Sequence, residues 1–93
     1  MATKRFSRPA EHDLKYLPQR TLDVLRREHI PRLSANPRIG KQLHGPLRGL
    51  FAYDFHTEGI SYRIAYELMR GEVIIVMIDT RDNFYKKLSR RIN

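Results

Sequence analysis

The stretch FAYDFHTEGISYRIAYELMRGEVIIVMID, residues 51–79, carries the clearest structural pattern of the sequence. Apolar side chains alternate with polar or small ones over residues 51–55 and again over 62–68, which is the period of a β-strand with one buried face. Residues 73–78 are apolar throughout, as is typical of a strand that is covered on both faces. Because short turns join the three segments, we expect them to form an antiparallel meander.

The residues before this stretch have helical spacing instead. Residues 3–8 are expected to form one short strand, and Pro9 suits the first turn of a helix, where the backbone N–H has no partner in any case. Leucines then recur at intervals close to multiples of three or four, which predicts a buried helical stripe. The stripe consists of Leu14, Leu17, Leu22, Leu25 and Leu33. Pro18 and Pro31 predict breaks or kinks near Leu17 and Ile30, so we expect a bent helix or a helical pair that ends at residues 36–40.

The C-terminal segment completes the predicted fold. Residues 81–91 have helical spacing, with Phe84 and Leu88 one turn apart on the side that faces the core. The apolar face of the strand at 62–68 has to be buried, so we expect the helical pair to cover it. The prediction is a single α+β domain over residues 1–93 with the order β-α-α-β-β-β-α. It has a small antiparallel sheet, a helical pair on one face and a C-terminal helix.

The composition limits the classes of partner. The chain has 93 residues and no cysteine, so a small core must be stable without disulfides or a thiolate-bound metal. Lys and Arg total 18 against 10 Asp and Glu, which gives a formal charge of +8. Such an excess favours a polyanionic partner such as nucleic acid, the ribosome or an acidic protein. The longest apolar run, 73–78, is far too short to span a bilayer, and no signal peptide is recognisable, so we expect a cytoplasmic protein without a membrane partner.

Arg63 is the first candidate for a functional side chain. It lies between Tyr62 and Ile64 in a predicted strand, and its side chain points to the opposite face from theirs. A guanidinium in such a place needs a carboxylate, a carbonyl or an external phosphate. Two explanations stay open: an ordinary cross-strand pair with Asp54 or Glu67, or a phosphate-binding role.

Arg81 and Tyr85 form the second candidate group. They are four residues apart, so both lie on one stripe if the last helix includes them; alternatively, Arg81 leads into that helix at the end of the sheet. Two arginines and a phenol on one concave surface can bind a phosphate, offset the charge that develops on it, and exchange a proton. We therefore treat Arg63, Arg81 and Tyr85 as candidate catalytic residues. The ordinary alternative is an exposed helix with an Arg–Tyr contact.

Further basic residues are expected to add phosphate contacts that carry affinity but no sequence information. They are Lys41, His44, Arg48, Lys86 and Arg90. The four histidines are dispersed, and no HxxxH, HExxH or carboxylate cluster indicates a metal ligand set. We therefore expect no metal and no cofactor.

Four motifs along the chain match one known family in order and spacing. Residues 10–18, AEHDLKYLP, look like the opening helix of RelE-type toxins, and residues 36–45, NPRIGKQLHG, look like a loop of the form NPxxGxxLxG. Residues 62–66, YRIAY, match a strand motif, and residues 78–85, IDTRDNFY, match the C-terminal pattern IxxRxxxY. With these motifs the chain resembles the RelE/ParE superfamily of type II toxins, and its RelE branch in particular.

The resemblance implies an activity and partners. RelE-type toxins cleave messenger RNA in the ribosomal A site without a metal, by attack of the 2′-hydroxyl on the adjacent phosphate, and a cognate antitoxin neutralises them. By position, Arg63 and Arg81 match arginines that stabilise phosphate charge, and Tyr85 matches a tyrosine that supports base or orienting chemistry. The chain is therefore expected to be an endoribonuclease toxin with an antitoxin, the ribosome and mRNA as partners.

One departure from the family pattern keeps other functions open. RelE-type enzymes often carry lysines on the second strand, where this sequence has Ala52 and Asp54, which cannot replace two ammonium groups at a phosphate. Either His56, Lys41 or Arg48 compensates, or the target differs. The alternatives are a ParE-like toxin that inhibits DNA gyrase through protein contacts, and an RNA-binding module without enzymatic activity.

Overall fold

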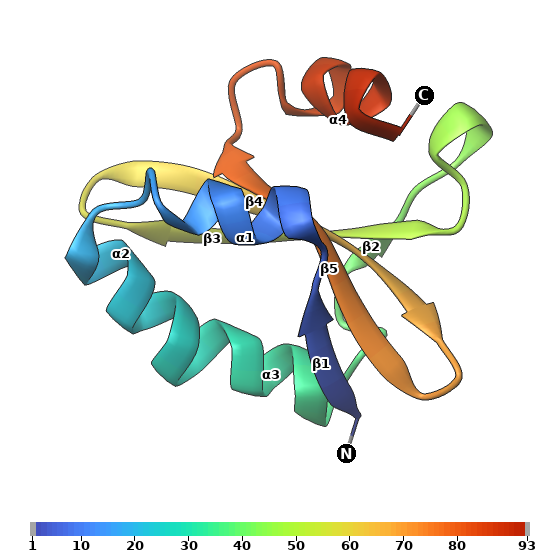
Figure 1. Ribbon diagram of the computed structural model, residues 1–93, viewed down its shortest axis with the longest axis horizontal. Helices are drawn as coiled ribbons and strands as arrows, with labels where there is room; N and C mark the ends of the chain where they lie inside the picture. The colour runs from blue at the N-terminus through green and yellow to red at the C-terminus, as the bar shows by residue number, and fades with distance from the viewer. Residues whose placement is uncertain (1, 93) are drawn as a thin grey trace.

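The computed structural model describes residues 2–92 and shows one twisted sheet with helices on both sides (Figure 1). The strand order is β1-β5-β4-β3-β2. The strands are β1 (Thr3–Phe6), β2 (Lys41–Gln42), β3 (Leu50–Thr57), β4 (Ile60–Met69) and β5 (Glu72–Thr80). The α+β class, the predicted element order and the antiparallel meander of β3, β4 and β5 are confirmed.

The two edge strands differ from the sequence-based expectations in different ways. β1 pairs with β5 in parallel, so the sheet is mixed. The first three residues of β1 are exposed, which explains why its sequence carries only one strong apolar residue, Phe6. β2 was expected to be part of a loop; its two residues pair with Phe51 and Ala52 of β3. Strands this short at an edge have too few side chains to show a period of two.

The helical half begins as predicted and continues without a break past Pro31. Ser7 caps α1 (Arg8–Leu14), because its hydroxyl accepts the Ala10 N–H at 3.2 Å, and Pro9 lies in the first turn. The chain breaks at Pro18 before α2 (Gln19–Val24). Near Pro31, where a break or a kink is predicted, the helix is irregular but unbroken: a π-helical turn, Leu25–His29, joins α2 to α3 (Ile30–Ala35). In this wider turn the Ile30 N–H donates to the carbonyl five residues back, which accommodates a proline ring that would clash in a regular α-helix.

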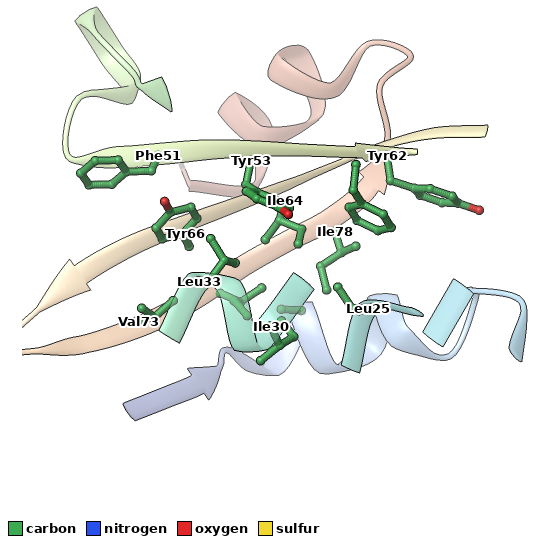
Figure 2. Packing of buried hydrophobic residues seen from close by; sticks show 13 residues of the cluster. Leu25, Ile30, Leu33, Phe51, Tyr53, Tyr62, Ile64, Tyr66, Val73 and Ile78 are labelled. Carbon is green, nitrogen blue, oxygen red and sulfur yellow. The ribbon is translucent and has the colours of Figure 1, made fainter. Parts of the chain in front are cut away.

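The helical layer covers one face of the sheet, as predicted (Figure 2). Tyr62, Ile64 and Tyr66 of β4 pack there against the helices. The remaining labelled members of this cluster are Leu25, Ile30, Leu33, Phe51, Tyr53, Val73 and Ile78. Among residues 2–92, no helix is long and apolar enough to cross a membrane.

Tyr66 fixes the loop that leads into β2. Its hydroxyl donates to the Pro37 carbonyl at 2.8 Å and accepts the Gly40 N–H at 3.0 Å. A Cβ on Gly40 would lie 2.6 Å from the same hydroxyl oxygen, so only glycine permits this approach. The loop is thereby held against the sheet, and the next residue, Lys41, is placed opposite Ala52.

The other face of the sheet is covered by α4 (Phe84–Ile92), which lies on the opposite side from α2 and α3 (Figure 1). A β-bulge in β5 shifts its pairing with β4 by one residue. Ala65 is opposite Met77 and Tyr66 is opposite Ile75, so Val76 has no partner residue on β4. Met77 therefore joins Phe84 and Leu88 in a second buried cluster. The prediction that the helix starts at residue 81 is wrong, because Asn83 has a φ of 54° and ends the non-helical turn.

A buried polar pair lies under the sheet on the helical side. His29 is 7% exposed, its Nδ1 lies 2.7 Å from the Tyr53 hydroxyl, and its ring packs on Phe55 at a centroid distance of 4.4 Å. Arg32 donates to the same phenolic oxygen at 3.5 Å. The phenol can therefore give its own proton to His29 Nδ1, which requires a neutral imidazole.

Acidification is expected to destabilise the protein through His29. The pKa of His29 lies below its ordinary value of 6.5, because burial disfavours the cation and Arg32 repels it, while Glu28 partly opposes the shift. The unfolded state therefore binds the proton more readily than the folded state. The contribution of neutral His29 to the free energy of unfolding is fully present above pH 6.5 and is lost as the pH falls toward the folded-state pKa. Urea unfolding should show a slope of at most about 1.4 kcal/mol per pH unit in this range. The slope should disappear in His29→Phe; if it persists there, another group causes it.

Candidate functional site

Asp54 and Arg63 lie directly opposite each other on β3 and β4, on the face that α4 covers. Arg63 Nε donates to Asp54 Oδ1 at 2.7 Å, and Nη2 donates to Oδ2 at 3.2 Å. The Arg63 side chain is only 12% exposed, whereas that of Asp54 is 48% exposed. The structure therefore contains the cross-strand pair that the sequence left open as one explanation for Arg63. The carboxylate orients the guanidinium in a bidentate geometry.

Two aromatic rings of α4 cover the same guanidinium. Arg63 Cζ lies 4.6 Å from the centroid of Tyr85 and 5.7 Å from that of Phe84. Both distances fall within the range of cation–π attraction. Because Phe84 is buried against the sheet and Tyr85 is only half-buried, Tyr85 is the ring on the open side of the cluster. Arg63 is thus fixed by Asp54 within the sheet and by α4 above it.

Arg81 reaches the cluster from the end of β5. Its backbone N–H donates to the Ser61 carbonyl at 3.1 Å, which ties it to the start of β4. Its Nε lies 3.9 Å from Asp54 Oδ2, and its side chain is 52% exposed. Arg81 and Tyr85 do not share a helical stripe, since the helix begins only at Phe84. The three candidate catalytic residues nevertheless come together: Asp54 approaches both arginines, and the Tyr85 ring lies over Arg63.

Asp54 is the counter-ion of this basic cluster. The Arg63 guanidinium donates hydrogen bonds that hold the pKa of Asp54 below its ordinary value; burial opposes the shift, and the charges of Arg63, Arg81 and Lys41 add to it. The carboxylate is therefore ionised at neutral pH. In turn, the hydrogen bonds to Asp54 raise the pKa of Arg63. Asp54 thus places a negative charge beside both Arg63 and Arg81.

Ala52, the other departure from the family pattern, has a structural explanation. It is 6% exposed, lies opposite Ala65 of β4, and belongs to the cluster under α4 with Phe84 and Leu88. Two adjacent alanines leave room for these larger side chains to pack close to the sheet. A lysine at position 52 would have to displace this packing. The alanine thus serves the docking of α4 in this chain.

Two of the five predicted phosphate-binding residues lie beside the cluster. Lys41 and His44 line a hollow of about 190 Å³ together with Tyr85. Arg48, Lys86 and Arg90 are exposed. Within residues 2–92, no hydrogen bond or ion pair connects these three to Arg63. His56 is engaged elsewhere, since its Nδ1 lies 3.0 Å from the Ser61 hydroxyl. No group of three or more His, Cys, Asp or Glu residues in the described part of the chain is arranged to hold a metal ion.

One interaction was not foreseen from the sequence. Asp13 of α1 and Arg91 of α4 form a bidentate ion pair with distances of 2.7 and 2.9 Å. Residues 13 and 91 are too far apart in sequence for spacing to connect them. The sequence held one indication of a special role for Arg91. It lies on the same helix face as Phe84 and Leu88, at a position where an apolar residue is expected.

The sequence matches the family model of the ParE-like toxins of type II bacterial toxin-antitoxin systems over residues 3–89. The chain belongs to this family. No curated protein matches the sequence significantly. Membership of the RelE/ParE superfamily, predicted from the four motifs, is confirmed.

Solved structures of related toxins share the fold. A chain of the RelBE2 toxin–antitoxin complex from Mycobacterium tuberculosis has a TM-score of 0.76 and 34% identity, over 86% of this chain and 98% of that one. The isolated RelE toxin of E. coli has a TM-score of 0.70 and 18% identity, over 100% of both chains. YafQ from E. coli has a TM-score of 0.61 and 16% identity, over 91% of this chain and 99% of its own. The toxin described here thus has a RelE-like fold.

Proposed function

We propose that this toxin is an endoribonuclease that needs no metal, cleaves messenger RNA at the ribosome and thereby inhibits translation. The observation that carries the proposal is the convergence of Arg63 from β4, Arg81 from the turn after β5 and Tyr85 from α4 on one face of the sheet. Two guanidinium groups and a phenol at one place supply what phosphate-ester cleavage requires: charge stabilisation and a group that exchanges a proton. The RelE-like motifs support the same activity.

In the proposed reaction the 2′-hydroxyl of a nucleotide attacks the adjacent phosphorus. The bond from the 2′-oxygen to phosphorus forms as the 2′-hydroxyl gives up its proton, and the bond to the 5′-oxygen breaks as that oxygen takes up a proton, which leaves a 2′,3′-cyclic phosphate and a 5′-hydroxyl. Arg63 and Arg81 offset the negative charge that develops on the non-bridging oxygens. Tyr85 orients the reacting groups or exchanges a proton with them. Lys41 and His44, which line a hollow with Tyr85, contact the neighbouring phosphates.

Asp54 has to give way when a phosphate binds. Its side chain is 48% exposed, so it can turn toward solvent, whereas Arg63 is held by α4 and is only 12% exposed. A phosphate that takes the place of the carboxylate finds Arg63 already oriented, with Arg81 on the same side. Arg48, Lys86 and Arg90 then act as further phosphate contacts at a distance, which strengthen binding without sequence preference.

A cognate antitoxin is the second proposed partner. The RelBE2 structure from M. tuberculosis and the RelBE structure from E. coli are both toxin–antitoxin complexes. With a formal charge of +8, this toxin is expected to bind an acidic, partly disordered segment that folds on contact.

The Asp54–Arg63 pair also favours a second candidate function, inhibition of DNA gyrase through protein contacts. If the pair stays closed, Arg63 is a structural residue and no free anion site exists. The match to the ParE-like family model agrees equally well with this activity.

Induction of the toxin in a bacterial host distinguishes the two candidates. We expect new transcript 5′ ends inside translated reading frames, and we expect them to disappear in Tyr85→Phe, which removes only the hydroxyl. Tyr16→Phe is the matched control, because Tyr16 is 76% exposed and lies outside the cluster. Intact transcripts together with inhibited supercoiling by purified gyrase would instead support the gyrase function.

A further inference from the structure

The edge of β5 is left open where β1 ends. β1 pairs with residues 72–75 of β5, and the Ser7 N–H donates to the Ile75 carbonyl at 2.9 Å as the chain turns into α1. Beyond that point, no strand among residues 2–92 pairs with the β5 backbone on this side. The Asp13 carboxylate accepts the Ile78 N–H at 3.0 Å, and Arg91 donates to the Val76 carbonyl at 3.0 Å. Two side chains thus satisfy the backbone groups that a neighbouring strand would otherwise pair.

The same two side chains join α1 to α4. Arg91 Nη1 and Nη2 lie 2.7 and 2.9 Å from the two oxygens of Asp13. The side chains are 28% and 14% exposed, respectively, so water screens the pair only partly. By contrast, the ion pair Lys87–Asp79, which joins α4 to β5, has side chains that are 44% and 38% exposed. Arg91 therefore makes the more strongly held polar contact of α4.

Arg91 lies on the same side of α4 as the two buried residues of the helix. Phe84, Leu88 and Arg91 are spaced by four and three residues and lie on one side of the helix. The two apolar residues are 1% and 0% exposed, but a nine-residue helix with two apolar anchors is short. Helices of this length are marginal without tertiary contacts. The third anchor is the polar contact to Asp13 and to the Val76 carbonyl at the β-bulge.

We propose that Asp13 and Arg91 are positioning residues: together they hold α4 on the sheet and thereby keep Tyr85 against Arg63. Tyr85 belongs to α4, so its place 4.6 Å from Arg63 Cζ depends on how α4 lies on the second face. Release of the C-terminal end of α4 lets Tyr85 move away, while Arg63 and Arg81 stay in place on the strands. A variant that releases α4 is therefore expected to cleave RNA more slowly but to bind it as before; this expectation rests on the proposed ribonuclease function.

Hydrogen exchange and NMR of the full chain test this positioning role without any RNA. In Arg91→Met we expect exchange of the α4 amides to accelerate by about tenfold or more, while amides of β3 and β4 stay protected. The Arg63 Nε–H resonance should lose the ring-current shift caused by Tyr85. Arg91→Lys, which keeps the charge but not the bidentate geometry, should give an intermediate result. Lys87→Met is the control, since it breaks the exposed ion pair of the same helix and should leave both readouts near the wild-type values.

Two outcomes would overturn the proposal. One is an unchanged α4 exchange rate and Arg63 resonance in Arg91→Met. The other is faster exchange by the same factor in β3, β4 and α4, which would mean a general loss of stability. Cleavage assays add a separate reading: kcat should fall in Arg91→Met while the KM for RNA changes little. If the wild-type toxin cleaves no RNA but Arg91→Met still releases α4, the positioning role stands and the proposed nuclease function fails.

Discussion

Replacement of Arg81 by alanine is expected to slow RNA cleavage by about 10²–10³-fold, the usual effect of removing one donor from a site that stabilises transition-state charge. The free energy of unfolding should change by less than about 0.5 kcal/mol. Stability should change little because the Arg81 side chain is 52% exposed and its Nε approaches Asp54 only to 3.9 Å. The backbone hydrogen bond from Arg81 to Ser61 does not involve its side chain and is retained.

The measurement is single-turnover cleavage of mRNA on purified ribosomes, with urea unfolding of the same samples. Arg20→Ala is the matched control, because it removes the same charge at a distant place. Arg20 lies on α2, its side chain is 83% exposed, and it makes one weak ion pair with Glu58 at 3.6 Å. Equal losses of activity in the two variants would show that only the overall charge matters. Arg63→Ala is a less informative change, since it leaves Asp54 unpaired and removes the contact with Tyr85.

The alternating pattern of residues 51–68 was sufficient to predict the central part of the fold. It placed Tyr62, Ile64 and Tyr66 on the buried helical side and Arg63 on the other, and both assignments agree with the structure. The prediction was reliable because the period of two is a direct consequence of strand geometry. The bulge at Val76 was not predictable in this way, since residues 73–78 are uniformly apolar and show no alternation that an inserted residue would disturb.

The misplaced helix boundaries have local causes that propensity does not reveal. Pro31 normally predicts a break, but a single π-helical turn keeps the helix continuous and directs His29 into the core. Asn83 adopts a left-handed conformation that delays the last helix until Phe84. Asparagine tolerates the left-handed conformation better than most residues, but only a minority of asparagines adopt it. The sequence therefore allowed either start for the helix.

For the candidate site, the sequence named candidate residues but left open how they contact one another. The family motifs singled out Arg63, Arg81 and Tyr85, and the structure brings these three together. That Asp54 is their shared counter-ion depends on the β3–β4 register, which places it directly opposite Arg63. Register is set by the turn and the packing of the whole sheet, so a list of motif residues does not contain it. The same holds for the pair Asp13–Arg91, which joins the two ends of the chain.

Asp54→Asn is expected to increase the affinity for a non-cleavable single-stranded RNA by about three- to tenfold near 0.1 M salt. The change removes the anion that competes with phosphate for Arg63 and Arg81. The amide oxygen of asparagine can still accept one hydrogen bond from Arg63, so the guanidinium stays oriented. Because one more cationic charge becomes available to phosphate, the plot of log K against log salt should steepen by about 0.7.

The control for this change is Asp23→Asn, which alters the net charge equally on the opposite side of the molecule. Asp23 is exposed on α2 and accepts a hydrogen bond from Gln19 at 2.9 Å. If the two variants bind RNA alike, the gain reflects overall charge and Asp54 does not occupy the phosphate position. A gain confined to Asp54→Asn would mean that the carboxylate limits access to the site in the wild-type toxin. The acidic side chain at position 54 then weakens RNA binding where RelE-type enzymes often carry a lysine, and the toxin should bind RNA less tightly than those relatives.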